Sequence, residues 1–178
     1  MKRLPALRPG ETIALELTGS PGLFDPKLRP KISVSRRWFP LLSEWADLIH
    51  DPELENLGRG LERDGIEKLS GMGPGLTPAG DDFIAGWIAA LRSVASPEAR
   101  RVIREFCAAW RPGKTNWLSK WMILDAIRGR TWKRGKDLLS AMGRNDGEAT
   151  AEAAAKILNW GHTSGKAWQA GFARGFLF

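Results

Sequence analysis

Two adjacent aspartates, Asp81 and Asp82, follow a glycine-rich stretch that spans residues 71–80. Four glycines and two prolines in this stretch predict a shaped loop, not a helix or strand interior. Thr77 followed by Pro78 is typical of a helix start, with threonine at the N-cap and proline at the first helical position. Carboxylates can hold a divalent cation, and free amides at a helix start can bind an anion. The pattern therefore predicts a metal or anion site at the start of a helix.

The residues that follow, from Phe83 to Leu91, are all apolar or small, which predicts a helix buried on nearly every side. Carboxylates at the mouth of a buried helix are costly unless something binds there, which favours a functional site. A structural role stays open, because acidic residues in a first turn stabilise a helix by about 0.3–1 kcal/mol. Nucleotide-binding loops fit less well, since Gly80-Asp81-Asp82 replaces the Gly-Lys-Ser/Thr of a P-loop and no good strand precedes the glycines.

Two later helix starts have similar chemistry. Residues 114–119 offer Thr115 as a cap, and residues 161–165 offer Thr163 or Ser164. Three polar helix starts in one small domain predict a shared pocket whose free amides bind an anion. His162 is a candidate general base or a structural hydrogen-bonding residue. The candidate catalytic residues are Asp81, Asp82 and His162, and the candidate metal ligands are Asp81 and Asp82. The candidate ligand-binding residues are Gly73, Gly75, Thr77, Gly80, Thr115, Asn116, Ser119, Gly161, Thr163, Ser164 and Gly165.

The rest of the chain predicts the elements that position this pocket. Residues 11–18 and 31–35 alternate in polarity, which predicts two short strands. Residues 38–50 have helical spacing, and Asp51-Pro52 should end that helix and begin another. Ser96 should cap a further helix with Phe106, Cys107 and Trp110 turned inward, and helices are expected throughout the remainder.

The predicted fold is α+β and predominantly α. A short β element is followed by a helical bundle around one pocket formed by the glycine-rich loop. We expect a single domain over residues 1–178, with a β-containing part at 1–37 and a helical part at 38–178. Near the end of the chain, Gly171 and Gly175 would allow close contact between helices.

Composition narrows the class of protein. The 43% hydrophobic and 26% charged content are ordinary for a globular domain, and one cysteine excludes an intramolecular disulfide. No stretch approaches the length of about 20 apolar residues that spans a membrane, and no apolar signal segment is visible near the start. We therefore expect a cytoplasmic protein. The net charge of +7 and the nine tryptophans permit nucleic-acid binding, but most tryptophans fall on apolar helical stripes and are expected as core or interface anchors.

Residues 71–83 closely resemble the signature of the domain of unknown function 2877 family. The segments at 115–119 and 161–171 resemble its second and third blocks, in the same order. That family includes a subunit of oxamate carbamoyltransferase, encoded beside two larger subunits. The resemblance implies carbamoyl-phosphate or oxamate chemistry.

Two functions stay open at this point. The chain could be a carbamoyltransferase-like enzyme, or a subunit of one, that binds a small anionic metabolite, with Mg²⁺ held by Asp81 and Asp82. It could instead be a non-catalytic regulatory or assembly subunit that docks onto larger partner subunits or forms a homo-oligomer. Nucleic acid ranks third among the partners, because the net charge and the tryptophan content alone support it, and no membrane partner is expected.

Overall fold

The computed structural model describes residue 32 and residues 36–177, and in this part of the chain the regular structure is helical. The α-helices are α1 (Phe39–Asp47), α2 (Glu55–Asp64), α3 (Ala79–Val94), α4 (Pro97–Ala109), α5 (Trp117–Ile127), α6 (Lys133–Gly143), α7 (Gly147–Leu158) and α8 (Ser164–Phe176). Short 3-10 helices lie at Arg36–Trp38, Leu48–His50, Pro52–Leu54, Ile66–Leu69 and Pro112–Lys114.

The predicted N-terminal β element is not supported. Residues 11–18 lie outside the described part of the chain, and of residues 31–35 only Ile32 is described. Ile32 lies in no strand; its backbone N–H donates to the carbonyl oxygen of Ser93, 3.1 Å away. The prediction of a predominantly helical bundle is confirmed for the described residues, and no strand occurs among them.

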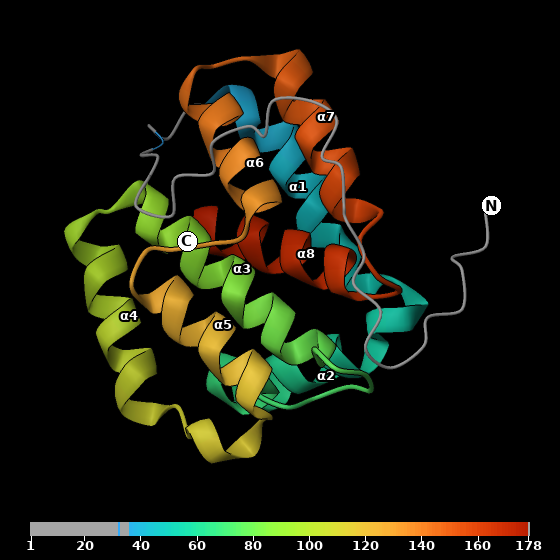
Figure 1. The fold of residues 1–178 in the computed structure, drawn as a ribbon, viewed down its shortest axis with the longest axis vertical. Helices are drawn as coiled ribbons and strands as arrows, with labels where there is room; N and C mark the ends of the chain where they lie inside the picture. The colour runs from blue at the N-terminus through green and yellow to red at the C-terminus, as the bar shows by residue number, and fades with distance from the viewer. Residues whose placement is uncertain (1–31, 33–35, 178) are drawn as a thin grey trace, which may run out of the picture.

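Helices α3 and α8 cross at the centre of the molecule (Figure 1). Every residue of α3 except Arg92 and Val94 is buried, which confirms the predicted burial of Phe83, Trp87 and Leu91. The helix begins at Ala79, so Pro78 and not Thr77 occupies the N-cap position.

Glycines allow the two central helices to approach closely. A Cβ atom added to Gly86 of α3 would overlap the carbonyl oxygen of Trp168 in α8, and one on Gly171 would overlap that of Phe83. Gly175 meets Trp87 in the same way. The close helix contact predicted at Gly171 and Gly175 is therefore confirmed.

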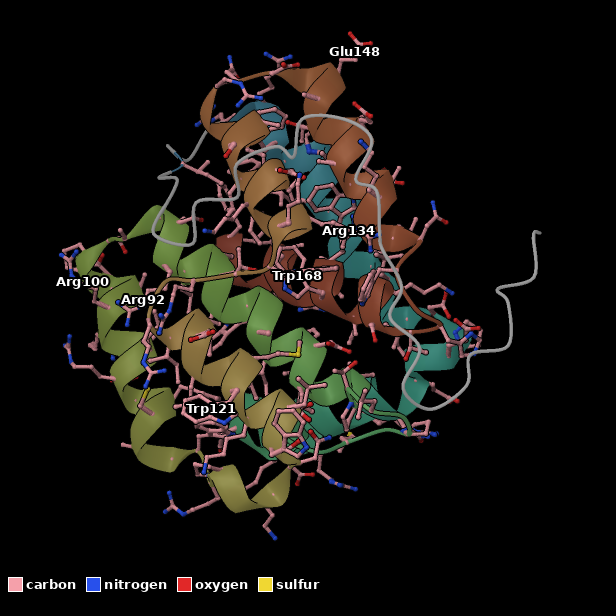
Figure 2. All side chains as sticks on the ribbon, in the orientation of Figure 1. Arg92, Arg100, Trp121, Arg134, Glu148 and Trp168 are labelled. Atoms are coloured by element: carbon pink, nitrogen blue, oxygen red, sulfur yellow. The ribbon has the colours of Figure 1, made fainter. Side chains whose placement is uncertain are left out.

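The other helices cover this central pair with two apolar clusters. In one, Phe83 and Ile88 of α3 pack against α2, α4 and α5. In the other, Trp168 and Phe172 of α8 pack against α1, α6 and α7, and their rings stack with centroids 5.2 Å apart. Trp168 lies in the centre of the molecule in Figure 2. Core packing thus covers most of both sides of the α3–α8 pair.

The prediction that Cys107 faces inward is wrong. Val102, Ile103 and Phe106 of α4 are buried, but the Cys107 side chain is exposed. Position 107 falls just outside the stripe that these three residues form, so the cysteine is not a core residue.

The chain has no helix, within its described residues, that is long and apolar enough to cross a bilayer. The cytoplasmic location stays a prediction.

We expect Gly171→Ala to lower the free energy of unfolding by about 1–3 kcal/mol, because the added methyl group must push α8 away from the backbone of α3. Chemical denaturation measures the change. Gly113→Ala is the matched control, since a Cβ atom there meets nothing within 4 Å. Equal stability of the two variants would contradict the close packing of α3 and α8.

Candidate functional site

The glycine-rich stretch forms the predicted shaped loop before α3. Gly71, Gly73 and Gly75 have backbone φ angles of 78°, 106° and 101°, a region that side chains other than glycine rarely adopt. The backbone N–H of Gly80 donates to the carbonyl oxygen of Met72 over 2.9 Å, which joins the loop to the first turn of the helix. The amide of Gly80 is therefore engaged within the protein.

Asp81 is fully buried and ties three segments together. One carboxylate oxygen, Oδ1, accepts hydrogen bonds from the Gly71 backbone N–H (2.9 Å) and the Ser70 hydroxyl (3.2 Å). The other, Oδ2, accepts a hydrogen bond from the Thr115 hydroxyl. A buried carboxylate satisfied in this way stabilises the loop and the start of α5. Asp81 therefore has a structural role, the reading that the sequence had left open.

Sequence reasoning missed two members of this network. The Ser70 hydroxyl accepts a hydrogen bond from the indole N–H of Trp110, 3.0 Å away, while it donates to Asp81. Ser70 directly precedes the loop, so its place in the sequence could have indicated that it belongs to the site. Nothing local connects Trp110 to the loop, 40 residues earlier in the chain.

Asp82 differs from its neighbour. Its side chain is also buried, at 3% exposure, but its Oδ2 atom has no hydrogen-bond partner among the described residues. Burial raises the pKa of Asp82 to about 7, and the charge of Asp81 acts in the same direction. Hydrogen bonds from Ser164 and Thr77 partly oppose that rise. Near neutral pH the carboxyl group therefore exists in both its protonated and its ionised form.

The first turns of α3, α5 and α8 meet around these aspartates. The hydroxyl groups of Thr77 and Ser164 lie 3.2 Å apart and join the start of α3 to that of α8. The Asn116 side-chain amide donates to the carbonyl oxygen of Leu76 over 2.8 Å, which joins α5 to the loop. We call the meeting point of Thr77, Asp82 and Ser164 the Asp82 corner. The three polar helix starts are therefore in contact, and the anion-binding pocket predicted between them stays a prediction.

The caps of α5 and α8 differ from the sequence prediction. Asn116 caps α5 by accepting a hydrogen bond from the Ser119 N–H at 3.0 Å, while Thr115 turns to Asp81. The Ser119 hydroxyl is fully buried without a partner among the described residues. Thr163 occupies the N-cap position of α8, but its side chain makes no capping hydrogen bond.

The remaining candidates lie around the start of α8. Gly165 is buried against the backbone of Ile157, and its N–H donates to the carbonyl oxygen of Trp160. Gly161 is exposed. The His162 side chain is 84% exposed, and its Nε2 atom lies 3.4 Å from Oε1 of Glu53. A role for His162 as a general base stays a prediction.

The predicted pocket formed by the glycine-rich loop is not supported. A cavity of about 600 Å³ lies elsewhere and has these lining residues: Ser43, Ala46, Asp47, Leu61, Ile66, Phe83, Trp87, Arg174 and Leu177. The glycine-rich loop contributes none of them, because its ends are drawn against the helix by the Asp81 and Gly80 hydrogen bonds.

A cation site would depend on Asp82 alone. Asp81 already accepts hydrogen bonds on both carboxylate oxygens. The described residues contain no group of three or more histidine, cysteine, aspartate or glutamate side chains that could hold a metal ion. This donor set does not fit a Mg²⁺ ion held by the protein alone, and Mg²⁺ binding stays a prediction.

The fold and the corner define a helical protein in which a glycine loop and three helix starts surround a buried carboxyl group. A family model described as oxamate carbamoyltransferase subunit AllH matches residues 69–176, more than half of the chain, and the chain belongs to this family. The match contains the loop, both aspartates and the starts of α5 and α8, and it confirms the resemblance drawn from the sequence. No curated protein and no solved structure matches the chain.

Proposed function

We propose that this chain is a subunit of an oxamate carbamoyltransferase-like enzyme and binds a small anionic metabolite at the Asp82 corner. The observation that carries the proposal is the unpartnered, buried Oδ2 atom of Asp82, beside two hydroxyl groups at the starts of two helices. Buried polar atoms in native proteins nearly always have a hydrogen-bond partner, so this atom is a candidate to receive one from a ligand. Membership of the subunit family supports the class of enzyme.

The surroundings of Asp82 suit an anion when the carboxyl group is protonated. A protonated carboxyl group donates a hydrogen bond, as do the hydroxyl groups of Thr77 and Ser164. The starts of α3 and α8 add the positive ends of two helix dipoles. A carboxylate or phosphate group could accept hydrogen bonds here, and the protonated Asp82 would not repel its negative charge. Because Asp82 is buried, entry of a ligand requires movement of the loop, whose residues Gly75 and Leu76 are exposed.

We expect oxamate or carbamoyl phosphate, at 100 times its dissociation constant, to stabilise the protein by about 2.7 kcal/mol, roughly 5–10 °C in melting temperature. Ser164→Ala should reduce this shift, because it removes a hydrogen-bond donor at the corner. Thermal unfolding with each anion, at pH 6.5 and with added Mg²⁺ as a further arm, measures both effects.

Ser96→Ala is the matched control, since Ser96 caps α4 and takes no part in the corner. It should lower the melting temperature and leave the ligand-induced shift unchanged. Indifference of the wild-type protein to both anions, with and without Mg²⁺, would contradict binding at the Asp82 corner.

A regulatory or assembly subunit is the second candidate, and the exposed apolar surface of α5 favours it. Assay of the purified chain, alone and together with its partner subunits, separates the two functions. Transfer activity of the chain alone would identify a catalytic subunit, whereas activity that resides entirely in the partners would identify a regulatory one.

A further inference from the structure

Helix α5 is as apolar as a core helix but is not covered like one. Eight of its eleven residues are apolar, yet only Ser119, Ile123 and Ala126 are buried. Helix α3 is similarly apolar and is almost wholly buried. Helices that are apolar on all sides are normally enclosed in a core. The other residues of α5 are half-buried, and only Trp117, Lys120 and Trp121 are exposed. The uncovered part of α5 is therefore one face that carries two tryptophans.

The exposed part of α5 carries two tryptophans on one face. Trp117 is 71% exposed and Trp121, labelled in Figure 2, is 52% exposed; the spacing of four residues places them side by side on the helix. Leu76 is 71% exposed and lies beside the start of α5, because its carbonyl oxygen accepts the Asn116 hydrogen bond. We call Leu76, Trp117 and Trp121 the α5 surface. Tryptophan is the residue most typical of binding hot spots at protein interfaces.

The α5 surface adjoins the Asp82 corner through the loop. Asn116, which immediately precedes Trp117, holds Leu76, and Leu76 is the residue before Thr77 of the corner. A protein seated on the α5 surface would therefore contact the same loop through which a ligand reaches Asp82.

Charge indicates which kind of partner fits. Residues 111–130 contain five Lys/Arg and one acidic residue, Asp125, which pairs with Arg128 and Arg130. Lys114 and Lys120 are exposed, and the structure gives them no carboxylate partner among the described residues. A second copy of this chain would bring like charges together, which opposes association, whereas an acidic surface would be attracted. Two free lysines beside three large apolar side chains fit a protein better than a polyphosphate chain.

We propose that the α5 surface docks a larger partner subunit, through an apolar patch on that subunit rimmed by aspartate and glutamate. The inference rests on the proposed function, because it requires that the chain works as a subunit. It adds the location of the interface and the chemistry of the partner.

The experiment starts from a tagged chain in its native cells. Proteins that co-purify in fixed stoichiometry are identified, produced separately and titrated with the purified chain by calorimetry. We expect Trp121→Glu to weaken binding at least 30-fold and Lys120→Glu to weaken it most at low salt. Leu158→Glu places the same charge on another exposed apolar residue and should bind like the wild type. Unchanged circular dichroism and melting temperature of the variants show that they fold.

The outcomes separate the inference from the proposed function. A partner that binds wild type and Trp121→Glu equally overturns the α5 interface but leaves the subunit role intact. Cross-linking of the complex locates the partner residues that contact α5, and a contact region without aspartate or glutamate also overturns the inference. Absence of any stoichiometric partner would remove both proposals. Self-association in sedimentation, or tight oligonucleotide binding at about 150 mM salt, would overturn the inference if Trp121→Glu abolished it.

Discussion

Replacement of Asp81 by alanine is expected to lower the free energy of unfolding by about 3–5 kcal/mol. The carboxylate is fully buried and accepts hydrogen bonds from Gly71, Ser70 and Thr115. Its removal leaves the Gly71 N–H and the buried Ser70 hydroxyl without their acceptor. Urea denaturation monitored by circular dichroism measures the loss.

The control for this prediction is Asp137→Ala. Asp137 forms an exposed ion pair with Lys133 on α6, and such pairs contribute little to stability. The Asp137 variant should unfold nearly like the wild type. If Asp81→Ala behaved in the same way, the hydrogen bonds of Asp81 would not hold the loop to α5.

Asp82→Asn is expected to have the opposite effect and to stabilise the protein at alkaline pH. The folded-state pKa of Asp82 is raised to about 7 from a usual value of 3.8, mainly by burial. The folded state thus binds this proton more tightly than the unfolded state, so ionisation costs stability as the pH rises from about 4 to about 7 and the cost then levels off. Asparagine carries no charge and avoids this cost.

The stability difference between Asp82→Asn and wild type should therefore increase between pH 4.5 and pH 8, by up to about 3 kcal/mol. Denaturation curves at several pH values measure it. Asp137→Asn, at an exposed position, should follow the wild type across the range. A constant difference between Asp82→Asn and wild type would mean that Asp82 ionises without penalty and that the Asp82 corner is not as closed as the structure describes.

The two aspartates show why adjacent residues in a motif need not share a role. Successive residues on a helix point about 100° apart. Asp81 therefore faces Ser70, Gly71 and Thr115, whereas Asp82 faces the Thr77 and Ser164 side. The sequence predicted one shared metal site for the pair. The hydrogen bonds give Asp81 a structural role that Asp82 lacks, and the shared metal site stays a prediction.

Local chemistry in the sequence was sufficient for most helix boundaries. Asp51-Pro52 marks a break between helices, Ser96 caps α4 as predicted, and α3 begins one residue after Pro78. Capping and proline effects act within one turn of backbone, so a sequence reading can find them. The apolar run after Phe83 likewise determined that α3 is the core helix.

Only the tertiary structure decided which hydrogen-bond partners the side chains at these helix starts have. Thr115 looks like a cap in sequence, but its hydroxyl bonds a carboxylate 34 residues away and leaves the cap to Asn116. Trp110 reaches Ser70 across 40 residues, and α5, as apolar as a buried helix, keeps Trp117 and Trp121 exposed. Hydrogen-bond partners and burial depend on which segments pack together, and no local pattern contains that information. The sequence by itself determined where the polar helix starts lie. The packing of α3, α5 and α8 decided that both carboxylate oxygens of Asp81 accept hydrogen bonds, while the Oδ2 atom of Asp82 has no partner among the described residues.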